Sequence, residues 1–368
     1  MDKAARALRR YGLEVYPTEV FVLIVLAVAA LVCLAVVTMS PRSSRRGPTP
    51  PPVPSEREIA QDDRRRAAII VNPTKFDDVE AVRHRVRAVC EAQGWGEPMW
   101  IETTEDDPGT GQAKQALEKG ADLICPLGGD GTVRAVAAGL IDSGVPLGLL
   151  PGGTGNLLAR NLDLPVDNIE EALRVALGGR DELIDVGTID IVTPGETQDT
   201  HKDYYFLVMA GMGFDASVMA DAPEKLKAQF GWPAYVVAGM KHLNGKRFQV
   251  DASIDDGPTF HRRVRTVVVG NVGRLQGGVE LLPDAQAADG ALDVVMLSPK
   301  GLIGWASVSA HIATRQRKGH PRVEHYRCRT MRLELGTTQE VQLDGDPIGP
   351  GKIVSFAVKP HCLTVRVA

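Results

Sequence analysis

The sequence predicts an α/β domain built on a parallel sheet, then a β-rich sandwich domain, with one transmembrane helix ahead of both. Three observations predict this arrangement. From residue 67 to about residue 182, short apolar runs alternate with helix-spaced segments, which is the pattern of a parallel sheet covered by helices. Beyond that boundary, strand-like runs are separated by turn residues and favour antiparallel pairing. Near the amino terminus, residues 20–40 carry no charge.

The uncharged segment 20–40 is about long enough to cross a bilayer as a helix. We expect an uncleaved single-pass anchor, because the run is long for a signal peptide and no A-x-A site follows it. Residues 1–19 would form a tail before it. Residues 41–66 would form an extended linker, since six prolines fall between Pro41 and Pro54. Similar basic clusters flank the segment, so charge alone does not orient it.

Composition excludes some classes of function. The chain has 368 residues and a formal net charge of −4, which argues against general nucleic-acid binding. Its five cysteines form no C-x-x-C pair, so neither a zinc site nor a disulfide framework is expected.

The first domain, residues 67–182, is predicted from alternating elements. Apolar runs at residues 67–72, 98–104, 121–127 and 146–151 indicate strands, and residues 79–92, 113–119 and 133–141 have helical spacing. Ligands of such sheets bind at the carboxyl ends of the strands. Two glycine pairs follow strands there, at Gly128-Gly129 and Gly152-Gly153.

The second domain, residues 183–368, contains strand-like runs interrupted by expected helices at about 233–242 and 302–314. The aromatic and lysine-containing segment 223–246 fits a membrane interface as well as it fits an amphipathic core helix. The basic segment 315–332 favours a solvated loop over a patch that binds anionic headgroups.

The sharpest signal is the pair of glycine-rich loops, LGGDGT at 127–132 and LPGGTGNLLAR at 150–160. Each follows a buried strand and opens a helix. Glycines allow main-chain amides to approach phosphate oxygens, and a helix N-terminus adds partial positive charge. No G-x-x-x-x-G-K-[ST] motif is present, so the chain is not a P-loop ATPase.

These loops resemble those of the diacylglycerol kinase catalytic-domain family, which includes sphingosine and ceramide kinases and bacterial lipid kinases. The resemblance also covers VNP (71–73), LIDVG (183–187), AGMGFDA (210–216), LPDAQAADGALDV (282–294) and LDGDP (343–347). It implies a nucleotide-binding first domain and a β-rich second domain, with ATP between them. It also implies final strands that help to join the two.

The resemblance implies roles for particular residues. Asp346 would be the proton acceptor with Asp344 beside it, Asp130 would reach a catalytic Mg²⁺, and Asp185 would belong to the same acidic network. A structural Mg²⁺ would be held by Asp289 and by main-chain oxygens of Gln286 and Ala291. The expected ATP-binding set is Asn72, Thr104, Gly128, Gly129, Asp130, Gly131, Thr132, Gly152, Gly153 and Thr154.

Simpler interpretations stand beside these roles. Asp344 and Asp346 also fit an Asp-Gly hairpin turn, and Asp289 fits another tight turn. Many relatives continue GGDGT with an Asn-Glu pair, whereas this chain has Arg134 and Ala135. A solvated position on the helix is favoured for Arg134 over a phosphate contact. Asp346 is one methylene shorter than the glutamate usual at its position.

The resemblance implies an ATP-dependent lipid kinase that phosphorylates the hydroxyl of diacylglycerol to give phosphatidic acid, with ATP and Mg²⁺ as cofactors. Its partners would be that lipid and the membrane, with a homodimer as one possible assembly. Because ATP is cytosolic, the catalytic part would face the cytoplasm. The alternatives are a kinase of a sphingoid base or ceramide, an NAD kinase, and a non-catalytic nucleotide-binding membrane protein.

Overall fold

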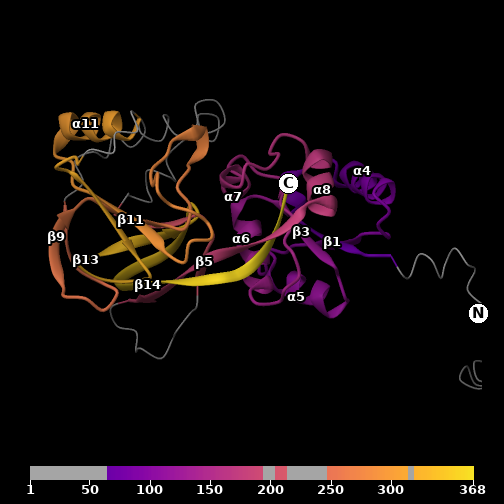
Figure 1. Cartoon of the computed structure of the whole chain (residues 1–368), viewed down its shortest axis with the longest axis horizontal. Helices are drawn as coiled ribbons and strands as arrows, with labels where there is room; N and C mark the ends of the chain where they lie inside the picture. Colours follow the sequence, from indigo (N-terminus) through magenta and orange to yellow (C-terminus); the bar gives the residue numbers. More distant parts are fainter. Residues whose placement is uncertain (1–63, 194–203, 214–246, 314–318) are drawn as a thin grey trace, which may run out of the picture. The chain divides into compact units, whose positions relative to one another are not determined.

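The computed structural model describes residues 64–193, 204–213, 247–313 and 319–368 (Figure 1). Its amino-terminal part contains a four-stranded parallel sheet in the order β2-β1-β3-β4. These strands are β1 (Ala67–Val71), β2 (Met99–Glu102), β3 (Leu123–Gly128) and β4 (Leu150–Pro151). The predicted parallel sheet is confirmed.

Helices cover both faces of this sheet because successive residues of a strand point to opposite sides. In β1, Ala68 and Ile70 join the core cluster that contains residues of α5 (Thr110–Glu118) and α6 (Asp130–Leu140). Ile69 and Val71 join the cluster of α4 (Val79–Ala92) and α8 (Ile169–Gly178). The short η2 (Pro73–Lys75) and α7 (Leu157–Asn161) follow β1 and β4.

The second part is β-rich and antiparallel, as predicted. Most of its strands follow the order β12-β11-β10-β7-β13-β14-β5-β6, with β8 on β13 and β9 on β8. The strands are β5 (Arg180–Val192), β6 (Tyr204–Phe206), β7 (Met209–Met212), β8 (Phe248–Ile254), β9 (Phe260–Val264), β10 (Thr266–Gly270), β11 (Leu292–Leu297), β12 (Val323–Cys328), β13 (Thr330–Leu343) and β14 (Asp346–Val367), with η4 (Gln276–Gly278) and α11 (Gly301–Ala313) between them.

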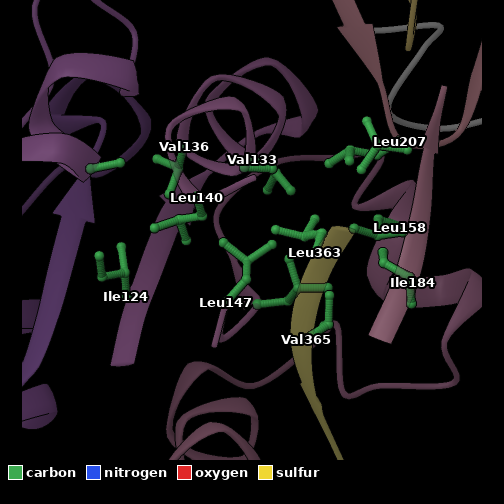
Figure 2. Packing of buried hydrophobic residues seen from close by; sticks show 14 of the residues in the cluster. Ile124, Val133, Val136, Leu140, Leu147, Leu158, Ile184, Leu207, Leu363 and Val365 are labelled. Atoms are coloured by element: carbon green, nitrogen blue, oxygen red, sulfur yellow. The ribbon is translucent and has the colours of Figure 1, made fainter. Parts of the chain in front are cut away.

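Strand β14 reaches back to the parallel sheet. Leu147 bridges Ile124 of β3 on one side and Val365 of β14 on the other. Leu363 and Val365 then pack in the same buried cluster as Ile124 and as residues of α6 (Figure 2). The two parts therefore share hydrophobic core as well as chain.

The predicted localisation, a single-pass membrane protein with a cytoplasmic catalytic domain, is contradicted. Across the described ranges, no helix combines the length and the apolar character that a membrane span requires. Helix α4 has 14 residues, whereas a span needs about 20. The proposed anchor at 20–40 lies outside the described residues, as do residues 1–19, the linker to residue 63 and the helix expected at 233–242.

Candidate active site

The carboxyl ends of the four parallel strands form one edge of the sheet. Val71 pairs with Glu102 and with Leu127, and Leu127 pairs with Leu150. The segments that follow this row include every residue of the expected ATP-binding set. The sheet therefore brings together loops that are separate in the sequence, at the edge where such sheets bind ligands.

The two glycine loops touch through their main chains. The Gly152 amide donates to the carbonyl oxygen of Gly128 at 3.1 Å. A Cβ added at Gly152 would lie 2.7 Å from the nitrogen of Gly128, and one added at Gly153 would lie 2.7 Å from the Cα of Gly129. Real Cβ atoms do not come so close to main-chain atoms, so contact between the loops itself requires the second glycine pair.

The first loop opens α6. Its N-cap residue is Gly129, which has no side chain to cap the helix. The first amides of a helix have no partner inside the helix. Together with the helix dipole they form a site suited to a phosphate or another anion.

Asp130 links the two loops. Its Oδ1 accepts a hydrogen bond from the Leu157 amide at 2.6 Å, which ties the first residue of α6 to the first residue of α7. A Cβ on Gly155 would lie 2.2 Å from Asp130 Oδ2, so glycine there leaves room for the carboxylate. Burial raises the pKa of Asp130 and nearby Asp346 adds to the rise, while the Leu157 and Asn156 amides oppose it.

The remaining predicted nucleotide residues have local partners. Asn72 accepts hydrogen bonds from the Thr74 amide and hydroxyl at 3.1 and 2.7 Å. The Thr104 hydroxyl accepts from the Asp107 amide at 3.1 Å. Thr132 is buried, and its side chain fills the space beside Gly128. Thr154 is exposed in the second loop. Asn72, Thr104 and Thr154 thus border the edge, whereas Thr132 supports the first loop from inside.

Asp344 is buried in the turn between β13 and β14, where its main chain has a positive φ of 49°. Its carboxylate accepts hydrogen bonds from the amides of Leu207, Val208 and Met209 at 3.2, 2.9 and 3.0 Å. Burial raises the pKa of Asp344 to about 6, against the lowering effect of Arg134 and of the three amides. Asp344 therefore fixes the turn to the start of β7.

Asp346 lies on the same turn but faces the first glycine loop. A Cβ on Gly131 would lie 2.9 Å from Asp346 Oδ2, and that oxygen accepts a hydrogen bond from Arg134 Nη2 at 2.8 Å. The expectation of a solvated Arg134 is wrong: its side chain is 18% exposed, and Nη1 donates to the carbonyl oxygen of Leu343 at 2.6 Å. An exposed helix position was expected because helix spacing cannot reveal a distant turn that packs beside it.

Asp185 does not join this group through a hydrogen bond. It is fully buried, and its carboxylate accepts hydrogen bonds from the amides of His361 and Gly290 at 2.8 and 2.7 Å. Its own amide donates to the carbonyl oxygen of Ala287 at 2.6 Å. Asp185 therefore joins the bend of β14 to the turn at 286–291. The LIDVG motif (183–187) alone did not reveal this structural position.

The expected structural Mg²⁺ residues lie on that turn. Asp289 Oδ1 accepts from the Ala291 amide at 3.1 Å, and the Arg327 guanidinium lies 2.8 Å from Asp289 Oδ2. Gln286 is exposed on the same turn. In the described ranges no group of three or more His, Cys, Asp or Glu side chains suits a metal ion. Arg327 forms an ion pair with Asp289 at this turn, and the Mg²⁺ set of Gln286, Asp289 and Ala291 stays a prediction.

The structure thus groups Asp130, Asp344 and Asp346 around the first glycine loop and leaves Asp185 and Asp289 together elsewhere. Sequence reasoning missed the contribution of Arg134. A signal was available, since a charged residue two positions after GGDGT lies in the first turns of α6, next to the first glycine loop.

Comparisons with known proteins agree with this geometry. Residues 66–189 match the diacylglycerol kinase catalytic domain family, and residues 207–367 match the YegS C-terminal NAD kinase beta sandwich-like domain. The chain is 28% identical over 298 residues to a diacylglycerol kinase of Bacillus subtilis strain 168, an alignment that covers 79% of this chain and 94% of the relative.

A second relative is a probable lipid kinase, YegS-like, from Yersinia pseudotuberculosis serotype I. It is 30% identical over 269 residues, covering 70% of this chain and 84% of the relative. Among solved structures, a diacylglycerol kinase from Bacillus anthracis str. Sterne has the same fold, with a TM-score of 0.62 and 20% identity over 83% of this chain and 98% of that one. The chain therefore belongs to the diacylglycerol kinase catalytic-domain family of lipid kinases.

Proposed function

We propose that this kinase transfers the γ-phosphoryl group of ATP to the hydroxyl of diacylglycerol and so forms phosphatidic acid. The observation that carries the proposal is the position of Asp346. Its carboxylate approaches Gly131, in the loop whose amides suit a phosphate group. A carboxylate so placed can accept the proton of an alcohol that attacks a phosphoryl group held by the loop.

The chain's own residues would divide the work. The main-chain amides that open α6 and the touching second loop would bind the phosphates of ATP, and the glycines would let those phosphates approach the main chain. Asp130 would hold the two loops together by accepting a hydrogen bond from the Leu157 amide. Asp346 would receive the hydroxyl proton, while buried Asp344 would hold the turn that carries it.

A divalent cation such as Mg²⁺ would neutralise charge on the phosphates when bound. The donor set around the glycine loops suits this role, because Mg²⁺ binds with one or two carboxylates, phosphate oxygens and several waters. Asp130, whose carboxylate accepts a hydrogen bond from the Leu157 amide, would supply a carboxylate ligand.

The test is transfer from γ-labelled ATP with Mg²⁺ to a panel of acceptors in mixed micelles. The panel contains diacylglycerol, a sphingoid base, ceramide and, without micelles, NAD. We expect labelled phosphatidic acid as the main product, and Asp346→Asn should abolish it while the variant still binds ATP.

Three results would replace the proposal. Faster transfer to a sphingoid base or ceramide would assign a different lipid alcohol, and labelled NADP would favour the NAD kinase alternative. ATP binding without transfer to any acceptor would favour a non-catalytic nucleotide-binding protein.

A further inference from the structure

We propose that Arg134 is a positioning residue that clamps the β13–β14 turn and thereby holds the Asp346 carboxylate over the first glycine loop. The inference deepens the proposed function and rests on it, because it concerns the carboxylate that would accept the substrate proton.

One guanidinium contacts both ends of the turn. Arg134 Nη1 donates to the carbonyl oxygen of Leu343 at 2.6 Å, and Nη2 donates to Asp346 Oδ2 at 2.8 Å. Nη1 also lies 3.8 Å from Asp344 Oδ2. The donors of a guanidinium are fixed in a planar fork, so these contacts set the direction of the Asp346 side chain relative to α6.

Asp346 depends on this contact for its orientation. Its side chain is 55% exposed, and Arg134 is the side-chain hydrogen-bond partner that the structure gives it among the described residues. Asp344 differs, because three main-chain amides hold its buried carboxylate whether or not Arg134 is present. Loss of Arg134 would therefore free Asp346 and leave Asp344 in place.

The contact matters for geometry more than for stability. Exposed ion pairs contribute little to folding stability, and Asp346 is more than half exposed. A displacement of about 1 Å near a reacting group, however, can cost about 10²-fold in rate. An aspartate is also short, so it reaches the loop only if its main chain is held close to α6.

The experiment compares the full chain with Arg134→Asn and Arg134→Lys, each with and without Asp346→Glu, in the labelled-ATP assay with diacylglycerol micelles. We expect Arg134→Asn to lower kcat by about 10²-fold, because the Asp346 carboxylate is no longer held in its orientation. The KM for ATP should change by no more than about threefold, since ground-state binding is retained. Arg134→Lys keeps the charge without the fork and should lose about tenfold.

The decisive arm is rescue. A glutamate carries its carboxylate one methylene further and can reach Gly131 without the clamp, so Asp346→Glu should recover at least about tenfold in kcat when added to Arg134→Asn. The matched control is Arg85→Asn, since Arg85 also donates to a carboxylate, Glu170 Oε1, at 2.9 Å. Its kcat should equal that of the wild type.

The outcomes separate the two proposals. An active wild type whose kcat is unchanged by Arg134→Asn would overturn the clamp and leave the proposed function standing. A loss of kcat that tracks a fall in the unfolding temperature and is not rescued by glutamate would also overturn it, because Arg134 would then act through stability. A wild type that phosphorylates none of the lipids would overturn the proposed function, and it would also overturn the proposed role of Arg134, which rests on that function.

Discussion

The contact between the glycine loops makes Gly153→Ala a sharp test of the site. The added Cβ would lie 2.7 Å from the Cα of Gly129, whereas carbon atoms in contact prefer about 3.5–4.0 Å. The loops must therefore separate by about 1 Å. Overpacking of this kind typically costs about 1–3 kcal/mol in the free energy of unfolding.

The same displacement should also lower the rate. In the proposed function the two loops bind one triphosphate between them, so a shift of about 1 Å should reduce kcat by about 10²-fold. The assays are urea-induced unfolding, which gives the stability change, and labelled-phosphate transfer, which gives kcat.

Two other alanine variants serve as controls. A Cβ on Gly178, in α8, meets nothing within 4 Å, so Gly178→Ala should be neutral or stabilise the fold by about 0.4–1 kcal/mol. A Cβ on Gly129 would lie 4.0 Å from the Cα of Gly153, an ordinary contact, so Gly129→Ala should change stability by less than about 0.5 kcal/mol. Wild-type stability and kcat in Gly153→Ala would refute the tight approach of the loops.

Three further predictions concern the carboxylates of Asp344, Asp130 and Asp185. The pKa of Asp344 rises from 3.8 to about 6 on folding, so its contribution to stability is complete below about pH 4 and is lost as pH rises through 6. That contribution is at most about 3 kcal/mol. The stability difference between wild type and Asp344→Asn should shift by up to that amount between pH 4 and pH 7.5 in urea unfolding, and a constant difference would contradict the raised pKa. Asp130→Ala should abolish transfer and cost about 1–3 kcal/mol of stability, because the Leu157 amide loses its acceptor; unchanged kcat would refute the assignment. Asp185→Ala should lower the unfolding temperature more than Asp130→Ala does, because two main-chain amides rather than one lose their acceptor, while kcat per folded molecule stays near wild type; a selective loss of kcat would place Asp185 in the chemistry.

The repeating elements of the fold were accessible from the sequence. The apolar runs before Gly128 and before Gly152 predicted two buried strands, and both strands end at the same edge of the sheet. Helix α6 begins at Asp130 rather than at the predicted Val133, because Asp and Gly suggest a turn when the loop that fixes them is unknown. Helix α8 was not predicted, although Asn168 caps it and two glutamates occupy its first turn.

The candidate site was less accessible because its contacts join distant segments. The sequence indicated the residue types of the glycine loops and the LDGDP turn, but it did not indicate that Arg134 connects them. Nor did it separate Asp185 from Asp130, since both are aspartates near glycine. Their difference arises from main-chain amides supplied by Gly290 and His361, whose proximity depends on the tertiary fold.

The return of β14 has a consequence for the order in which the protein folds. Val365 forms a bridge with Leu147, and Leu363 shares a buried cluster with Ile124, so the amino-terminal α/β part completes its core with residues from the last strand, β14. Such long-range contacts slow folding. During synthesis, the segment 67–182 would expose apolar surface until β14 emerged from the ribosome. That segment expressed alone should therefore be prone to aggregate.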